Sequence, residues 1–203
     1  MGAAGRVIKG FSLPYVALYN HEGGTVSYTQ GRKLARGVSI DVSVETTEEN
    51  NFYADNRVAE STPGIFNNGT LTLTVDGLFL EAERFIMGIK SEGKIDVDGK
   101  EVKTTDYGET MSIPYVGIGV IVQYQSEGVD SFEPVLFTKA SFNDTGTAAK
   151  TMEGSIDWQT KQITATLLRD DTANHNWKRV AEAQPTEEEA EAVIKAFLGI
   201  TEA

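Results

Sequence analysis

The chain has 203 residues, with 18 Lys or Arg against 30 Asp or Glu, which gives a formal net charge of −12 at pH 7. This acidic balance argues against a protein that wraps nucleic acid, because such binding needs Lys and Arg on the phosphates. The absence of cysteine excludes disulfides, thiolate catalysis and metal sites with Cys ligands. No stretch approaches the roughly 18 apolar residues of a membrane span, so no membrane partner is expected.

Alternation of apolar and polar residues dominates the sequence and predicts β-strands. The clearest strand is expected at 38–45, where an apolar phase of Val38, Ile40, Val42 and Val44 alternates with a polar phase of Ser39, Asp41, Ser43 and Glu45. The same pattern predicts strands at 70–75 and 162–167. Residues 116–122 are almost all apolar, which is typical of a central strand covered on both faces. Weaker strand patterns lie at 14–19, 25–29, 134–142 and 175–181.

One turn and two helices complete the prediction. Asp98-Gly99 is typical of a two-residue hairpin turn that sets Ile95 opposite Val102. A helix is expected at 77–88 with Asp76 as its cap. A second helix is expected at 186–198, because Thr186 and Glu189 form a capping box and Gly199 can end the helix.

Together these elements predict a mainly β fold, a β-sandwich or barrel with one or two flanking helices. No linker divides the chain, so residues 1–203 are expected to form a single domain. The amphipathic helix at 186–198 would pack on this domain or beside it.

Residues suited to catalysis are sparse. The two histidines, His21 and His175, lie in polar contexts that favour solvated loops. Asp96-Val97-Asp98-Gly99 resembles the start of a calcium loop but lacks the remaining ligands. The adjacent Asp170 and Asp171 could form a carboxylate pair, although a solvated turn explains them more simply. Since nothing assembles a nucleophile, a base and an oxyanion site, we expect no enzyme, and we assign no catalytic, cofactor-binding or metal-binding residue.

The stretch 45–63 is unusual because Phe52 and Tyr53 lie among polar residues between two predicted strands. One interpretation is a surface loop whose aromatic rings fold back onto the core. The other is a projecting arm that buries its aromatic rings in a partner, as interface anchors do.

Two blocks carry a resemblance to a known family. Phe52-Tyr53-Ala54-Asp55-Asn56 stands after an alternating strand and before Gly69-Thr70-Leu71-Thr72-Leu73, and the second block is the segment 150–160, which ends in Asp157-Trp158-Gln159-Thr160. Their order and spacing over residues 7 to 198 resemble the phi13-type major tail proteins of long-tailed bacteriophages.

The resemblance implies a tail-tube-type β-sandwich that closes into hexameric rings, stacked head to tail around a channel for DNA. It implies subunit contacts through Phe52, Tyr53, Asp55 and Asn56. It also implies a lumen lined by the polar phase of the strand 38–45, unless those carboxylates only solvate an outer face.

The same resemblance gives the expected partners and location. The chain would bind copies of itself, a tape-measure protein and the tail initiator and terminator proteins, while DNA passes without specific binding. It would be made and assembled in the host cytoplasm and reside in the virion tail.

Two other classes remain open. The inner tube of a contractile secretion system would share the fold and the acidity. A carbohydrate-binding or adhesive β-sandwich module would instead use Phe52, Tyr53, Asp55 and Asn56 to hold a ligand. The mass of the protein in solution separates these classes, because tube proteins form rings and an adhesive module stays a monomer.

Overall fold

The fold is mainly β, with one large antiparallel sheet and two helices, as predicted. The computed structural model describes residues 5–90, 92–109, 111–143, 146–152, 154 and 157–201. The large sheet has eight strands in the order β2-β1-β9-β10-β11-β6-β3, with β12 pairing β10 beside this path. Its strands are β1 (Val7–Glu22), β2 (Thr25–Lys33), β3 (Gly37–Thr46), β6 (Phe66–Val75), β9 (Val116–Ser126), β10 (Val129–Phe142), β11 (Lys161–Leu168) and β12 (Lys178–Val180).

The sheet folds over on itself so that its two halves enclose one core. Phe11 of β1 lies so close to Gly37, at the start of β3, that a Cβ on this glycine would collide with the ring, although the two strands are far apart in the strand order. The main core takes its buried side chains from the inward faces of the strands and from the helix α1 (Leu80–Met87). The largest of them include Leu71, Leu73, Ile118, Phe137, Phe142, Ile163 and Leu167.

The second helix, α2 (Glu187–Phe197), covers the outer face of the sheet and forms a second apolar cluster with β1, β9 and β10. Its predicted cap is confirmed, because the Thr186 side chain accepts a hydrogen bond from the Glu189 N–H at 3.2 Å. Gly117 and Gly119 let the outer layer approach β9 closely. A Cβ on Gly119 would collide with Ile194 of α2, and one on Gly117 would collide with the ring of Tyr28.

The predicted cap of the first helix is wrong. The helix begins at Leu80, and its N-cap residue is Phe79, which makes no side-chain capping hydrogen bond. Asp76 precedes the N-cap residue and binds Arg36 instead. Its carboxylate accepts hydrogen bonds from the backbone N–H and the guanidinium of Arg36 at 3.1 and 2.5 Å. The strand expected at 175–181 is also shorter than predicted and spans only 178–180.

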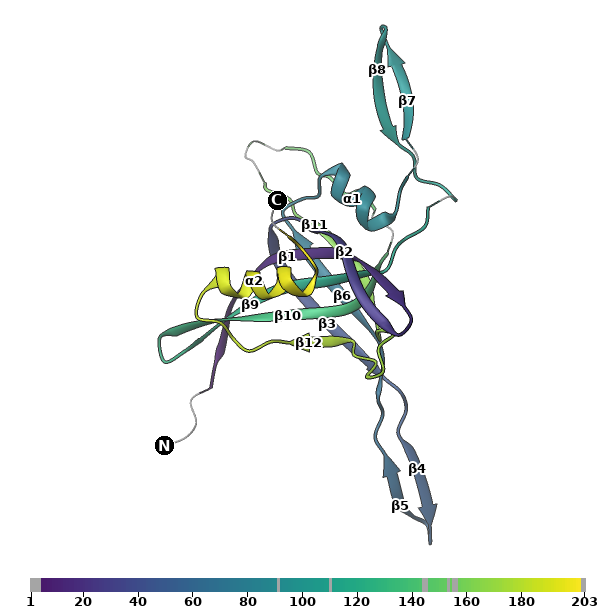
Figure 1. Cartoon of the computed structure of the whole chain (residues 1–203), viewed down its shortest axis with the longest axis vertical. Helices are drawn as coiled ribbons and strands as arrows, with labels where there is room; N and C mark the ends of the chain where they lie inside the picture. Colours follow the sequence, from purple (N-terminus) through teal and green to yellow (C-terminus); the bar gives the residue numbers. More distant parts are fainter. Residues whose placement is uncertain are drawn as a thin grey trace.

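Two hairpins leave the sheet in opposite directions (Figure 1). We call the hairpin of β4 (Asn50–Ala54) and β5 (Arg57–Thr62) the first arm, and the hairpin of β7 (Glu92–Val97) and β8 (Lys100–Thr105) the second arm. The eight-stranded sheet with the two helices is the body. The stretch 45–63 is therefore largely a hairpin.

Candidate assembly surfaces

The first arm ends in a tight two-residue turn. Asp55 and Asn56 both have left-handed backbone conformations, with φ of 52° and 60°, between the paired residues Ala54 and Arg57. A turn of this kind needs positive φ at both central positions, and Asp and Asn tolerate that conformation better than most residues with a side chain. This local chemistry explains why the polar sequence folds as a hairpin without a buried face.

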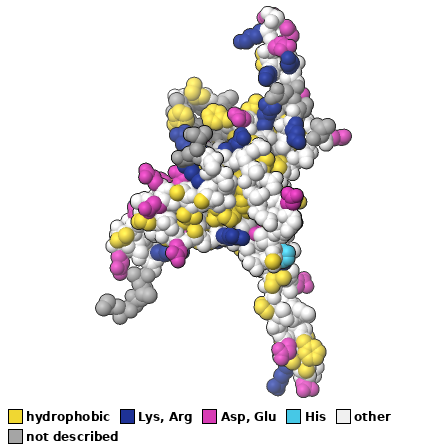
Figure 2. Space-filling model, in the orientation of Figure 1, with side chains coloured by type: hydrophobic (Ala, Val, Ile, Leu, Met, Phe, Trp, Pro, Cys, Tyr) yellow, Lys and Arg dark blue, Asp and Glu magenta, His cyan; other side chains and the backbone are white. Residues whose placement is uncertain are grey.

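The aromatic residues of the first arm lie in solvent. Phe52 is 64% exposed and Tyr53 is 63% exposed, and every residue of β5 is exposed. The interpretation in which these rings fold back onto the subunit's own core is therefore wrong for the isolated chain. Figure 2 shows the hydrophobic side chains gathered near the tip of the arm, beside charged ones. Their contact with another subunit stays a prediction.

The neck of the first arm is narrow. The Thr47 N–H donates to the Ile65 carbonyl oxygen at 2.8 Å, and the Ile65 N–H donates to the Thr47 hydroxyl at 3.0 Å. Gly64 passes so close to the Thr47 carbonyl that a Cβ there would collide with it. These contacts hold the two segments of the hairpin together where they leave the sheet.

The second arm has one apolar face. The predicted turn and register are confirmed, because Ile95 pairs with Val102, and Asp98 and Gly99 form the turn with positive φ. Ile95, Val97 and Val102 are all exposed. The Asp96 carboxylate accepts a hydrogen bond from the Gly99 N–H at 2.9 Å, which explains the calcium-like sequence as turn chemistry.

A continuous polar face covers the outer side of β3, β6 and β11. The inward residues Ile40 and Val42 of β3 pack against the core, and the outward residues of the same strand are exposed. The strand registers align the outward side chains in three rows of three. The rows are Ser39–Thr74–Gln162, Asp41–Thr72–Thr164 and Ser43–Thr70–Thr166, and we call these nine residues the hydroxyl face.

The hydroxyl face is less acidic than the sequence suggested. Asp41 is its one carboxylate, and Glu45 follows beyond it, paired with Asn68. The predicted exposure of Ser39, Asp41, Ser43 and Glu45 is confirmed, while their position in a lumen stays a prediction. The threonines of β6 and β11 were missed as part of this surface. Alternation within a strand shows which of its residues share a face, but it does not show which strands lie beside it.

The acidic pair Asp170–Asp171 forms structural contacts. Asp171 accepts hydrogen bonds from Lys139 Nζ and the Tyr19 hydroxyl, both at 2.7 Å. These bonds, chiefly the one from Lys139, lower the pKa of Asp171. Burial, together with the bond to Asp171, raises the pKa of Tyr19 to about 12. Asp170 is buried and accepts from the Thr172 hydroxyl at 2.6 Å.

The remaining candidates for chemistry are the two histidines. His21 is exposed near the end of β1, and His175 has its Nδ1 atom 3.2 Å from the Asp170 carbonyl oxygen. Among the residues that the structure describes, no three His, Asp or Glu side chains gather as a metal site requires. Within the same residues, no helix is long and apolar enough to cross a membrane.

The described residues of the second block, 150–152, 154 and 157–160, precede β11 and belong to no helix or strand. The Gln159 side chain donates to the Lys150 carbonyl at 3.2 Å and accepts from the Lys150 N–H at 2.9 Å, which links the two ends of the block. Trp158 is 85% exposed. Glu153, Ser155 and Ile156 of this block lie outside the described residues.

Comparison with known proteins adds no assignment. No protein-family model and no curated protein sequence matches the chain.

Proposed function

We propose that this chain is the structural subunit of a phage tail tube, forming hexameric rings that stack around a channel for DNA. The observation that carries the proposal is the combination of a continuous polar sheet face with two exposed, apolar-bearing arms that point in opposite directions. A subunit in a stacked tube needs a wetted wall and contacts at both ends. The resemblance of the two sequence blocks points to the same class of protein.

The ends of the sheet favour ring closure. Within the described part of the chain, β2 pairs only with β1 and β3 pairs only with β6, so each has one unpaired backbone edge. An exposed edge is a template for pairing with another chain, and closed assemblies remove it. In the proposed ring, neighbouring subunits cover these edges.

The proposed partners follow from this role. Copies of the same chain form the rings, the tape-measure protein occupies the channel during assembly, and initiator and terminator proteins bind the two ends of the tube. The site of action is the virion tail.

The hydroxyl face is the proposed lumen wall. Its neutral hydroxyls are hydrated, and Asp41 recurs once per subunit in every ring, so the wall repels phosphate at a range set by the Debye length, about 8 Å at physiological salt. The double variant Asp41→Lys with Glu45→Lys should still form rings but slow DNA ejection, and the slowing should fade as salt rises. Ejection at the normal rate in low salt, from tails of normal length, would contradict the lumen assignment.

Negative-stain electron microscopy over a concentration series tests the proposal. We expect monomers at low concentration and hexameric rings or tubes at high concentration. A compact monomer at every concentration, even with the initiator and tape-measure proteins supplied, would reject the proposal and favour an adhesive module.

A further inference from the structure

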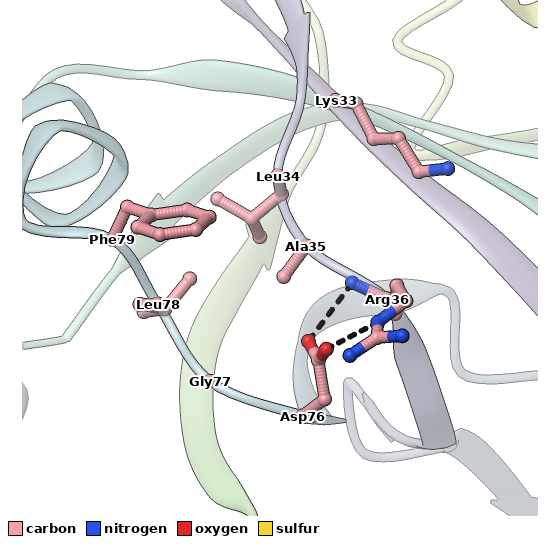
Figure 3. A pocket seen from close by; sticks show the side chains of 8 residues that line it. All are labelled: Lys33, Leu34, Ala35, Arg36, Asp76, Gly77, Leu78 and Phe79. Carbon is pink, nitrogen blue, oxygen red and sulfur yellow. Dashed lines mark hydrogen bonds and ion pairs between the residues drawn. The ribbon is translucent and has the colours of Figure 1, made fainter.

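A hollow of about 590 Å³ lies where the loop from β2 to β3 meets the loop from β6 to α1 (Figure 3). Its apolar wall consists of Leu34, Ala35, Leu78 and Phe79. The Phe79 ring is 86% exposed, so an aromatic side chain of the wall faces solvent without cover from the rest of the chain. We call this hollow the α1 pocket.

The rim of the α1 pocket carries positive charge. Lys33, Arg36 and Asp76 line it, and all three are exposed, so the two cations exceed the one carboxylate by a single positive charge. Arg36 is held in place by its ion pair with Asp76, and the guanidinium lowers the pKa of that carboxyl. Figure 3 shows this pair on one side of the pocket, Phe79 and Leu78 on the opposite side, and Leu34 and Ala35 between them.

The tip of the first arm has the complementary properties. Phe52 and Tyr53 offer two exposed aromatic rings, which point to opposite faces of the hairpin because the two residues are consecutive in β4. The charged side chains beside them are Asp55 in the turn, Arg57 at the start of β5 and Glu60, which leaves an excess of one negative charge at the tip. A pocket of this volume lies in the range that encloses small apolar groups, and buried aromatic residues are the commonest interface anchors.

The geometry excludes contact within one chain and fits contact between two. In Figure 1 the first arm extends from the lower end of the body, whereas α1 lies in its upper part. Eight residues of extended chain separate the neck at Thr47 from the turn at Asp55, a reach of about 25 Å. The arm of one copy can therefore reach the upper part of another copy placed below it in the same orientation.

We infer that the α1 pocket receives the aromatic tip of the first arm of a second copy of this chain, with one of the two rings, Phe52 or Tyr53, entering the hollow and the acidic tip facing the basic rim. This inference rests on the proposed function and identifies the contact between successive rings. The two surfaces differ, so the contact is head to tail and can repeat without limit, as a tube requires.

The variant Phe79→Asp tests the pocket. It removes an apolar wall and places a carboxylate where the acidic tip should dock. Asp is also a preferred N-cap residue, so α1 should not be weakened. We expect an unchanged or higher melting temperature for the monomer and loss of tubes. Leu80→Asp is the matched control, because Leu80 is exposed next to Phe79 but does not line the pocket.

Mixing two variants distinguishes the loss of one contact from a general loss of folding. The tip variant (Phe52→Ser with Tyr53→Ser) keeps its pocket, and Phe79→Asp keeps its tip. Each alone should form no tubes, whereas the mixture should form two-ring particles that grow no further. Tubes of normal length from Phe79→Asp alone, or no two-ring particles from the mixture, would overturn the inference.

Cross-linking locates the contact directly, because the chain has no cysteine of its own. Ala54→Cys combined with Ala35→Cys keeps Phe52, Tyr53 and Phe79 and should give disulfide-linked multimers when assembled protein is oxidised. Ala54→Cys with Val129→Cys should not. If wild type forms tubes and the first pair does not cross-link, the pocket inference fails and the tube function stands. If wild type never assembles, both fail.

Discussion

The body and the two arms are built from the same kind of secondary structure but obtain stability in different ways. In the body, each alternating strand has an inward face in the common core, as the buried Leu71 and Leu73 of β6 show. In the first arm, all residues of β5 are exposed, and the hairpin depends on its turn and its neck. A lone two-stranded hairpin is marginal in water, so the arms are expected to gain order from a partner. Buried residues of the body therefore stabilise the fold, whereas exposed residues of the arms can contact another molecule.

The largest expected effect is on the core. Phe137 is 2% exposed and lies in the main cluster. Phe137→Ala should lower the free energy of unfolding by about 3–5 kcal/mol, since it removes apolar contact and leaves a cavity. Urea denaturation of the monomer measures the change. A loss below about 1 kcal/mol would show that the body is not the unit of stability.

A smaller effect is expected where α2 meets the sheet. Gly119→Ala places a Cβ against the branched side chain of Ile194 and should cost about 1–3 kcal/mol through overpacking. Gly108→Ala is the control, because a Cβ there meets nothing within 4 Å. Equal stabilities for the two variants would contradict the close packing of α2 on β9.

The cap of α2 gives the next effect. Thr186→Ala removes the acceptor for the Glu189 N–H and should lower the free energy of unfolding by about 1 kcal/mol. Thr186→Ser keeps a hydroxyl and should retain most of that stability. Thermal unfolding followed by circular dichroism compares the two. If Ala and Ser behave alike, the hydroxyl does not stabilise this helix.

The smallest effect on the monomer is expected in the first arm. Phe52→Ala with Tyr53→Ala should change the free energy of unfolding by less than about 0.5 kcal/mol, because both rings are exposed. The same variant should abolish tubes in electron microscopy. A loss of unfolding free energy as large as that of Phe137→Ala would show that these rings pack in the core. The arm would then be stabilised in the same way as the body.

The body could be predicted from sequence because burial of one face imposes alternation. The strands at 38–45, 70–75 and 162–167 were found in this way, and the central strand at 116–122 lies between β1 and β10 as its apolar run indicated. The first arm has no buried face, so no alternation marks it. Asp76 was misread as a cap because its partner Arg36 is 40 residues away.

The surfaces for assembly required tertiary information. The hydroxyl face depends on the register of three strands, and the α1 pocket joins two loops that are separated by about forty residues of sequence. Sequence singled out Phe52 and Tyr53, since they are out of place among polar neighbours, but left open whether their rings pack on the core or project from it. Sequence could not identify the α1 pocket, whose members look like ordinary core and loop residues.

The pairing of β1 with β9 has a consequence for the order of folding. Leu18 pairs with Val116, so the first strand of the chain gains this neighbour only after nearly one hundred further residues have been synthesised. Non-local pairings of this kind close slowly, whereas an isolated hairpin can form in about 1–10 μs. During translation both arms, including the aromatic tip, emerge before β9 and can form before the core closes. The residues of the proposed contact between rings are therefore exposed on the nascent chain before the strand that completes the sheet has been synthesised.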